Sequence, residues 1–272
     1  MNRDPVVAGQ FYPGTKEALA KELKLLVDPK ANKVDAIGVV SPHAGYIYSG
    51  PVAGSVFSAI KSVPTYVIIG PNHTGLGGQF GLSTCRWWKT PLGKIEVDTD
   101  LAAAIKKNYA HIKDDDISHQ FEHSIEVQLP FLQYLQKDFK IVPLVAAHAD
   151  LDTYREVGRA IAAAIKARGA TTTTGKAVIV ASSDMTHYEP QAQAKRKDDE
   201  AIKAILSLDE GALIDKIASL DISMCGYAPV TIMISAAKAL GAKNAKLVRY
   251  QTSGDATGDY SSVVGYAGII VY

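Results

Sequence analysis

The sequence predicts an α/β fold with three layers, in which helices cover both faces of a mostly parallel or mixed central sheet. Short apolar segments recur along the chain, and the clearest are Tyr66–Ile69 and Ala177–Ala181. Each ends at residues that form turns, and helical patterns lie between them. Strands that are apolar along their whole length are typical of parallel sheets buried on both faces. Because no linker or internal repeat interrupts this pattern, residues 1–272 are predicted to form one domain.

The first elements follow from capping residues and composition. Residues 3–13 mix Gly and Pro with apolar side chains, which indicates an irregular arm packed on the domain. Thr15 can cap a helix that ends at Leu26. An apolar strand is predicted at 36–40. Proline is tolerated in the first turn of a helix, so a short helix is predicted to begin after Pro51 and to lead to the strand at Tyr66.

The middle of the chain changes in composition. Residues 77–97 are rich in Gly and Trp and predict a small hairpin or irregular insertion. An Asp-Thr pair begins a predicted helix over 98–108. A further helix is predicted over 124–136, with Ser124 as its cap and Pro130 marking a kink or a boundary.

The second half alternates strands and helices more regularly. Apolar segments predict strands at 139–145 and 177–181, and Gly169 closes a long helix over 152–168. A run of threonines at 171–174 is predicted to be a loop. The remaining predicted helices and closing strands cover 192–207, 210–220, 230–240, 246–251 and 263–271.

Charge and cysteine content exclude several classes of protein. The formal net charge is +1 and no run of Lys or Arg stands out, so neither nucleic acid nor a membrane surface is predicted as a partner. Two cysteines cannot build a disulfide framework, which favours the reducing cytosol. No apolar run approaches the ~20 residues of a membrane span, and the first residues lack the apolar core of a signal peptide. A cytoplasmic protein is therefore expected.

Several familiar motifs are missing. The sequence has no Gly-rich phosphate loop ending in Gly-Lys-Ser/Thr, which argues against a nucleoside triphosphatase. It also lacks G-x-G-x-x-G after the first strand, and the motifs G-x-S-x-G, H-E-x-x-H and C-x-x-C. A dinucleotide cofactor is therefore not predicted.

The distribution of histidines is more informative. Two of the seven, His111 and His119, lie in polar surroundings and are predicted to be surface residues. The others lie at strand exits or at the starts of elements, namely His43, His73, His123, His148 and His187. Because ligands of α/β proteins bind at the carboxyl ends of the strands, histidines there are expected to share a site. The alternative is that each one only caps its own loop.

A metal site is the chemistry that these residues favour. Neutral imidazoles from His43 and His73 suit Fe, Cu or Zn, and such a metal needs a further ligand. Cys225 is the candidate, because it lies in a loop before a helix, where the helix N-terminus and a metal would both favour the thiolate. The alternative is a structural, buried cysteine, which is the interpretation given to Cys85.

Residues near the same strand exits could move protons. Asp184 and His187 share one loop, and a carboxylate beside an imidazole raises its basicity, as a general base requires. Asp184 could instead cap the next turn. His123, preceded by Glu122, either lines the same pocket or caps its helix.

Six short segments together resemble the Memo family, and the resemblance runs from Arg3 to the last strand. The segments are VAGQFYP at 7–13, SPHAGYIYSG at 41–50, GPNHTG at 70–75, EHSIEVQLP at 122–130, SDMTH at 183–187 and CGY at 225–227. More narrowly, the chain is similar to the prokaryotic branch, protein B of the AmmeMemoRadiSam system.

This resemblance implies a fold like that of the class III extradiol (LigB-like) dioxygenases, which are non-haem iron enzymes. It implies that His43 and His73 bind the metal, and that Cys225 stands where those enzymes place a glutamate. It also implies that His187, with Asp184, takes the place of the catalytic acid and base. Fe(II) is then the expected metal, with Cu or Zn as alternatives, and a thiolate in place of a carboxylate weakens the direct transfer of ring-cleaving chemistry.

Three functions follow as hypotheses. The first is a metal-dependent redox enzyme that uses O₂, with His187 moving protons. The second is a non-catalytic binding or accessory module that takes a small molecule, a peptide or a partner protein in the same cleft. The family resemblance links such a module to a radical-SAM protein. The third and weakest is a zinc hydrolase with His187 as its base.

Overall fold

The structure is a computed structural model that describes residues 2–169 and 176–272, so the predicted loop at 171–174 lies outside the described residues. Within that part of the chain, twelve strands form one sheet. They are β1 (Asn2–Arg3), β2 (Gly38–Ser41), β3 (Thr65–Pro71), β4 (Phe80–Leu82), β5 (Trp87–Thr90), β6 (Gly93–Val97), β7 (Ile112–Asp114), β8 (Lys140–Ala146), β9 (Ala177–Ser182), β10 (His187–Glu189), β11 (Ala245–Thr252) and β12 (Val263–Val271).

Along the sheet the order is β1-β5-β6-β8-β3-β9-β2-β12-β10, with β11 paired to β12 and β4 paired to β7 and β8. The central strands β8, β3, β9 and β2 are parallel, whereas β12 runs antiparallel to β2. The predicted hairpin at 77–97 is confirmed by the antiparallel pair β5 and β6. The sheet is therefore mixed, with a parallel centre.

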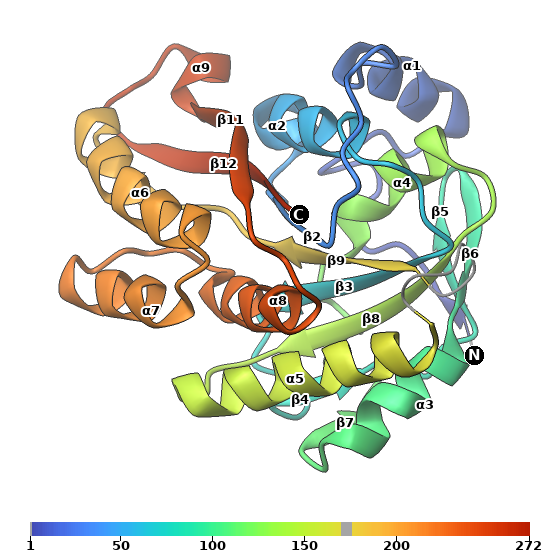
Figure 1. The fold of residues 1–272 in the computed structure, drawn as a ribbon. Helices are drawn as coiled ribbons and strands as arrows, with labels where there is room; N and C mark the ends of the chain where they lie inside the picture. Colours follow the sequence, from blue (N-terminus) through green and yellow to red (C-terminus); the bar gives the residue numbers. More distant parts are fainter. Residues whose placement is uncertain (1, 170–175) are drawn as a thin grey trace.

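Helices cover both faces of this sheet, which confirms the predicted three-layer fold (Figure 1). The layer that contains α1, α2 and α4 packs on one face, and the layer that contains α3, α5 and α8 packs on the other, with α6 and α7 beside α8. The helices are α1 (Lys16–Leu26), α2 (Tyr46–Ser58), α3 (Thr99–Asn108), α4 (Leu129–Leu135), α5 (Leu151–Ala167), α6 (Gln191–Leu206), α7 (Glu210–Ser219), α8 (Tyr227–Ala239) and α9 (Gly254–Thr257).

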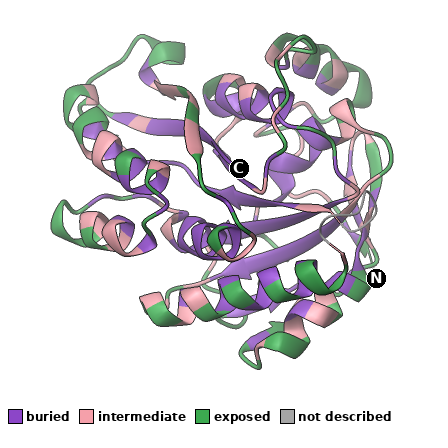
Figure 2. Cartoon of the chain, in the orientation of Figure 1, coloured by how far each residue is buried: buried purple, intermediate pink, exposed green. Residues whose placement is uncertain are grey.

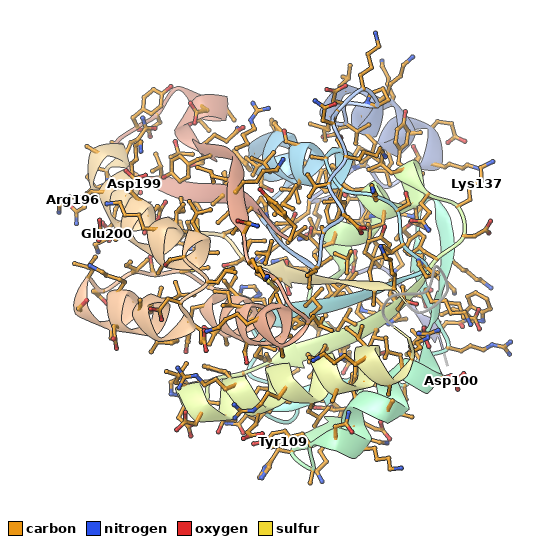
Figure 3. The ribbon with its side chains drawn as sticks, viewed as in Figure 1. Asp100, Tyr109, Lys137, Arg196, Asp199 and Glu200 are labelled. Atoms are coloured by element: carbon orange, nitrogen blue, oxygen red, sulfur yellow. The ribbon has the colours of Figure 1, made fainter. Side chains whose placement is uncertain are left out.

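Strand β3 shows why its sequence carries no charge. Val67 and Ile69 pack in the core on one side of the sheet, and Tyr66 and Ile68 pack in the core on the other. Successive side chains of a strand point to opposite faces, so a strand between two helical layers needs apolar residues at every position. Figure 2 shows the central strands buried and the outer faces of the helices exposed. Charged residues such as Asp100 and Glu200 lie on those outer faces (Figure 3).

Two predicted helices were placed wrongly. Helix α2 begins at Tyr46 rather than after Pro51. The Tyr46 N–H donates to the Phe11 carbonyl at 2.7 Å, and this contact with the N-terminal arm fixes the start of the helix. The predicted helix at 124–136 is a 3₁₀ turn at Glu126–Gln128 followed by α4, with Pro130 in the first turn of α4. Ser124 is not the cap, since its hydroxyl has no hydrogen-bond partner among the described residues and Ile125 precedes the 3₁₀ turn.

The register of the parallel strands brings four strand exits to one edge. Ser41 of β2 lies opposite Ser182 of β9, and Pro71 of β3 lies opposite Ala146 of β8. The loops that follow these strands therefore start side by side. No helix within residues 2–169 and 176–272 has both the length and the apolar character that crossing a bilayer requires.

Candidate metal centre

A pocket of about 360 Å³ lies at this edge of the sheet. Its polar wall contains five residues that the sequence singled out, namely His43, His73, His123, Asp184 and His187. Its apolar wall includes aromatic rings and aliphatic side chains, from Phe11, Ile47, Tyr48, Tyr188, Val264 and Tyr266. The exits of β2, β3 and β9 and the segment before the 3₁₀ turn thus contribute to one cavity.

Three imidazoles gather in this pocket. One ring nitrogen each from His43, His73 and His123 lies within 4.8 Å of the others, which is close enough for one metal ion to contact all three. The rings of His73 and His123 stack with centroids 4.9 Å apart, and the His43 ring stands edge-on to both. His43 is buried, whereas 32% of the His73 side chain is exposed.

Hydrogen bonds fix the protonated nitrogen of His43. The Ser182 hydroxyl donates its single proton to the Ser124 carbonyl at 2.7 Å, and it accepts from the Gln128 amide. His43 Nδ1, 2.9 Å from the Ser182 oxygen, must therefore be the donor in that contact. The lone pair then lies on Nε2. Burial, and next the charges of His73 and His123, lower the pKa of His43 well below its usual value, so the ring is neutral.

Glu122 fixes His73 in the same way. Its buried carboxylate accepts from the backbone N–H groups of His73, His123 and Ser124, and from His73 Nδ1 at 3.0 Å. Burial opposes ionisation of Glu122, but the hydrogen bond and charge of His73 outweigh it and hold the pKa of the carboxyl well below its usual range. With Nδ1–H donated to Glu122, the Nε2 lone pair of His73 is left for a metal.

His123 completes the group of imidazoles. Its Nδ1 lies 3.7 Å from the Glu122 carboxylate, and the Phe11 ring meets its ring edge-on at 4.8 Å. Burial lowers the pKa of His123, although the charge of Glu122 opposes this effect. Of the two alternatives for this residue, the structure shows it in the pocket rather than capping a helix.

Cys225 contacts one of the three imidazoles, that of His43. Its Sγ lies 3.3 Å from His43 Nε2 and accepts from the Asp184 N–H, also at 3.3 Å. Gly226 permits this approach, because a Cβ at that position would come within 2.3 Å of the Ser182 carbonyl oxygen. Burial, and then the charge of Asp184, raise the pKa of the Cys225 thiol, although the hydrogen bond from the Asp184 N–H opposes them. The thiolate that the sequence predicts as a metal ligand would therefore depend on a bound metal.

Asp184 and His187 face the pocket but are bonded to other partners. The Asp184 carboxylate accepts the His43 N–H at 2.8 Å, and burial raises the pKa of Asp184 to about 6. His187 Nδ1 lies 2.8 Å from the Ser223 carbonyl and must donate to it, which leaves the Nε2 lone pair of His187 free. The predicted direct pair between the two side chains is not among the hydrogen bonds of the described residues.

The remaining histidines differ from expectation in two cases. His148 follows β8 as predicted, but it is exposed, lies outside the imidazole group and contacts the Tyr227 hydroxyl through Nδ1 at 2.8 Å. His119, predicted to be on the surface, is buried against Trp88. His111 is exposed as predicted.

Sequence reasoning missed the residues that orient the imidazoles. Glu122 was noticed only as a neighbour of His123, yet it binds His73, which lies 49 positions away. Ser182 ends an apolar strand and gave no sign of its contact with His43. The one pattern in the sequence that pointed to such orienting residues is the group of polar residues that follows an apolar strand.

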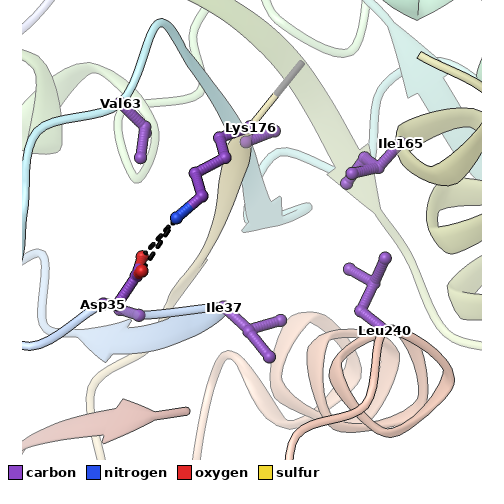
Figure 4. A pocket seen from close by; sticks show the side chains of 8 residues that line it. Asp35, Ile37, Val63, Ile165, Lys176 and Leu240 are labelled. Atoms are coloured by element: carbon purple, nitrogen blue, oxygen red, sulfur yellow. Dashed lines mark hydrogen bonds and ion pairs between the residues drawn. The ribbon is translucent and has the colours of Figure 1, made fainter. Parts of the chain in front are cut away.

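A second cavity, at the opposite end of the strands, has none of this chemistry. It measures about 300 Å³ and is lined mainly by apolar side chains, including Ile37, Ile165 and Leu240 (Figure 4). Its charged members, Asp35 and Lys176, pair with each other at 2.8 Å. The carboxyl edge of the sheet is therefore the better candidate for function.

The fold and this edge define an α/β protein with a candidate histidine metal centre. The family model described as Memo-like protein matches residues 3–270, and the chain therefore belongs to the Memo-like family. A MEMO1 family protein of Methanococcoides burtonii is 47% identical over 271 residues and covers 99% of both chains. MEMO1 family proteins of Pyrobaculum aerophilum and Methanococcus maripaludis are each 44% identical, over 99% and 100% of both chains.

Proposed function

We propose that the protein is a metal-dependent redox enzyme whose metal is held by His43, His73 and Cys225, with His123 beside them. The observation that supports this most is the pair of oriented lone pairs. His43 and His73 both donate Nδ1–H to a neighbouring oxygen and keep the lone pair on Nε2, which is how metal-binding histidines are usually arranged. Nε2 of His43 faces Cys225 Sγ, the third proposed ligand, at 3.3 Å. The imidazole donors of this pocket therefore fit a metal ion.

Fe(II) is the metal we propose, and Cu and Zn are the alternatives that imidazole and thiolate donors also accept. When bound, such a metal would supply one-electron or Lewis-acid chemistry. It would also bind the thiolate form of Cys225 and so displace the proton that burial retains on the sulfur. Release of a proton on metal binding is thus part of the proposal.

His187 is the residue that we propose for proton transfer. Its Nδ1–H is held by the Ser223 carbonyl, so Nε2 can accept a proton from a molecule in the pocket. Asp184, with a pKa raised to about 6 by burial, lies in the same wall and can exchange protons near neutral pH. The rings of Phe11 and Tyr266 form the apolar side of the pocket and exclude water from an organic ligand.

Metal analysis of ligand variants tests this function. Protein purified without added metal should contain nearly stoichiometric Fe or Cu, and His43→Ala, His73→Ala and Cys225→Ser should each lower that content. His111→Ala is the matched control, because this histidine is exposed and lies outside the pocket. If Cys225→Ser and His73→Ala retain the parent's metal content, the ligand set is wrong. Zn in place of Fe or Cu would favour the hydrolase, with His187 as its base.

A second function is supported by the rim of the pocket. Ile47 and Tyr188 are 70% and 78% exposed, and a binding module could use these apolar side chains to hold a small molecule or a peptide. By family resemblance, we also propose that such a module could serve a radical-SAM protein of the same system. Oxygen uptake with a catechol-like compound that disappears in His187→Ala would favour the enzyme over the module.

A further inference from the structure

A second pocket adjoins the metal centre at the same edge of the sheet. It measures about 460 Å³, within the size range of small-molecule sites. The loop after β3 contributes to both pockets, since His73 lines the first while Pro71 and Asn72 line the second. The start of α8 and the loop after β8 supply the rest of the wall, through Cys225, Tyr227 and His148.

Cys225 is exposed to this second pocket. It lines the second pocket, and it is not among the described residues that line the first. Sγ of the same residue contacts His43 Nε2 at 3.3 Å, so Cys225 links the imidazole group to the second pocket. The residue as a whole keeps intermediate exposure although many protein atoms surround it, which agrees with an opening on one side.

The walls of the second pocket favour an uncharged ligand. No Lys, Arg, Asp or Glu is among its described lining residues. Its polar groups are neutral or already paired: the Tyr227 hydroxyl contacts His148 Nδ1 at 2.8 Å, and the Gln79 amide donates to the His148 carbonyl at 2.8 Å. The carboxylate of Asp115, which accepts the Gly78 N–H, lies against the wall and would repel an anion.

We propose that this second pocket binds a small, uncharged polar molecule and brings it to Cys225 Sγ from the side away from His43. The metal centre would then have two entrances, one through the aromatic pocket and one through the polar pocket. The placement of Cys225 carries the proposal, and metal binding is not required for it. Failure of the proposed redox function would therefore leave it intact.

Two matched glycine variants can close one entrance each. Gly78 lines the second pocket, and a Cβ there would lie 3.6 Å from Asp115 Oδ2, an ordinary contact. Gly45 lines the first pocket, and a Cβ there would lie 3.6 Å from the Phe11 carbonyl oxygen. Neither glycine has a left-handed backbone, so Gly78→Leu and Gly45→Leu should both fold. Gly78→Ala and thermal unfolding of each variant check that the folded state is kept.

The probe is iodoacetamide, which is small and uncharged. Its reaction with Cys225 forms a carbon–sulfur bond, breaks the carbon–iodine bond and releases iodide, while the thiol proton passes to the buffer. Metal-free protein with Cys85→Ala is used, so that Cys225 is the single cysteine. Mass spectrometry follows the rate in the parent and in both leucine variants.

The expected result is a difference between the two entrances. Gly78→Leu should slow alkylation of Cys225 at least about tenfold, while Gly45→Leu changes it less than about twofold, because access limits the reaction of a buried thiol. The preference for iodoacetamide over iodoacetate should be at least about threefold larger in the folded protein than in urea, because the described residues that line the second pocket include no Lys or Arg. Slowing by Gly45→Leu alone, equal slowing by both variants or no reaction in the folded parent would overturn the proposal.

Discussion

Two buried regions of this molecule surround histidines in opposite ways. At the candidate metal centre, burial opposes the protonation of His73, but the hydrogen bond and charge of Glu122 outweigh it and raise the pKa of the imidazole. Near Trp88, His119 Nε2 donates to the Gly81 carbonyl at 2.9 Å, and burial lowers the pKa of His119 to about 4. The difference between the two histidines is thus the buried carboxylate of Glu122. It makes His73 suited to chemistry, whereas His119 has only a packing role.

Arg3 joins these two regions. Its guanidinium donates to the carbonyls of His119 and Glu122 and pairs with the buried Glu126 carboxylate at 2.6 Å. The same group lies over the Trp88 ring at 4.2 Å. The N-terminal arm therefore connects the segment that carries Glu122 to the core around His119, and changes on either side test the comparison.

Removing the carboxylate should have the largest effect. Glu122→Ala leaves three backbone N–H groups and His73 Nδ1–H without the acceptor that they share, so we expect a loss of roughly 4–5 kcal/mol of unfolding free energy. Metal affinity should fall about 10–100-fold, because the orientation of His73 is lost. Urea unfolding and metal titration measure the two effects. Glu156→Ala, an exposed partner of Arg159, is the control and should change stability by less than about 1 kcal/mol. Unchanged metal affinity in Glu122→Ala would mean that the carboxylate does not orient His73 for a metal, and the proposed difference between the two regions would be wrong.

Removing Arg3, which connects the two regions, should have the second-largest effect. Arg3→Met leaves the buried Glu126 carboxylate without its cation, although the Tyr12 hydroxyl still donates to it, so we expect a loss of roughly 3–4 kcal/mol in urea unfolding. Lys89→Met is the control, because Lys89 pairs with an exposed Asp4 at 2.7 Å, and its loss should stay below about 1 kcal/mol. Similar losses in the two variants would mean that Arg3 does not hold the regions together.

Much of the fold could be predicted from local pattern. Val67 and Ile69 alternate with Tyr66 and Ile68 without a charge, which requires a strand covered on both faces. Because parallel strands end at one edge, the positions of His43 and His73 after such strands already indicated a shared site. These inferences depend on neighbours in sequence, and the structure bears out both the fold and the proximity of the two rings.

What could not be predicted depends on contacts distant in sequence. His119 looked like a surface residue because its neighbours are polar, but the arm and Trp88 cover it. The protonation of Cys225 also depends on a distant residue, because the charge of Asp184, 41 positions earlier, adds to the effect of burial. Glu122 reaches His73 through a similar long-range contact. Protonation states are set by such contacts, which no local pattern contains.

His119 should make stability depend on pH. Its folded pKa of about 4 lies below the ordinary value of about 6.5, so the unfolded chain binds a proton first as pH falls. Stability therefore decreases as pH falls from about 6.5 to 4, by about 2.5 kcal/mol at pH 4.5, and the loss levels off below the folded pKa. Urea unfolding of metal-free parent and His119→Gln between pH 4.5 and 7.5 measures this contribution. A variant as pH-sensitive as the parent would show that His119 is not held neutral.

The smallest expected effect concerns the aromatic neighbours of the two regions. Phe11 meets the His123 ring edge-on at 4.8 Å, much as Trp88 meets the His119 ring at 5.5 Å. A double-mutant cycle of Phe11→Leu and His123→Ala should give a coupling energy of roughly 0.5–1.5 kcal/mol, the range of aromatic pairs beyond their buried area. The same cycle with Phe11→Leu and His111→Ala should give none, because His111 packs on Tyr109 instead. A coupling near zero for the first pair would mean that Phe11 does not stabilise the His123 ring. The N-terminal arm would then contribute through its contact with Glu126, and Glu122 would be the residue that positions the ring.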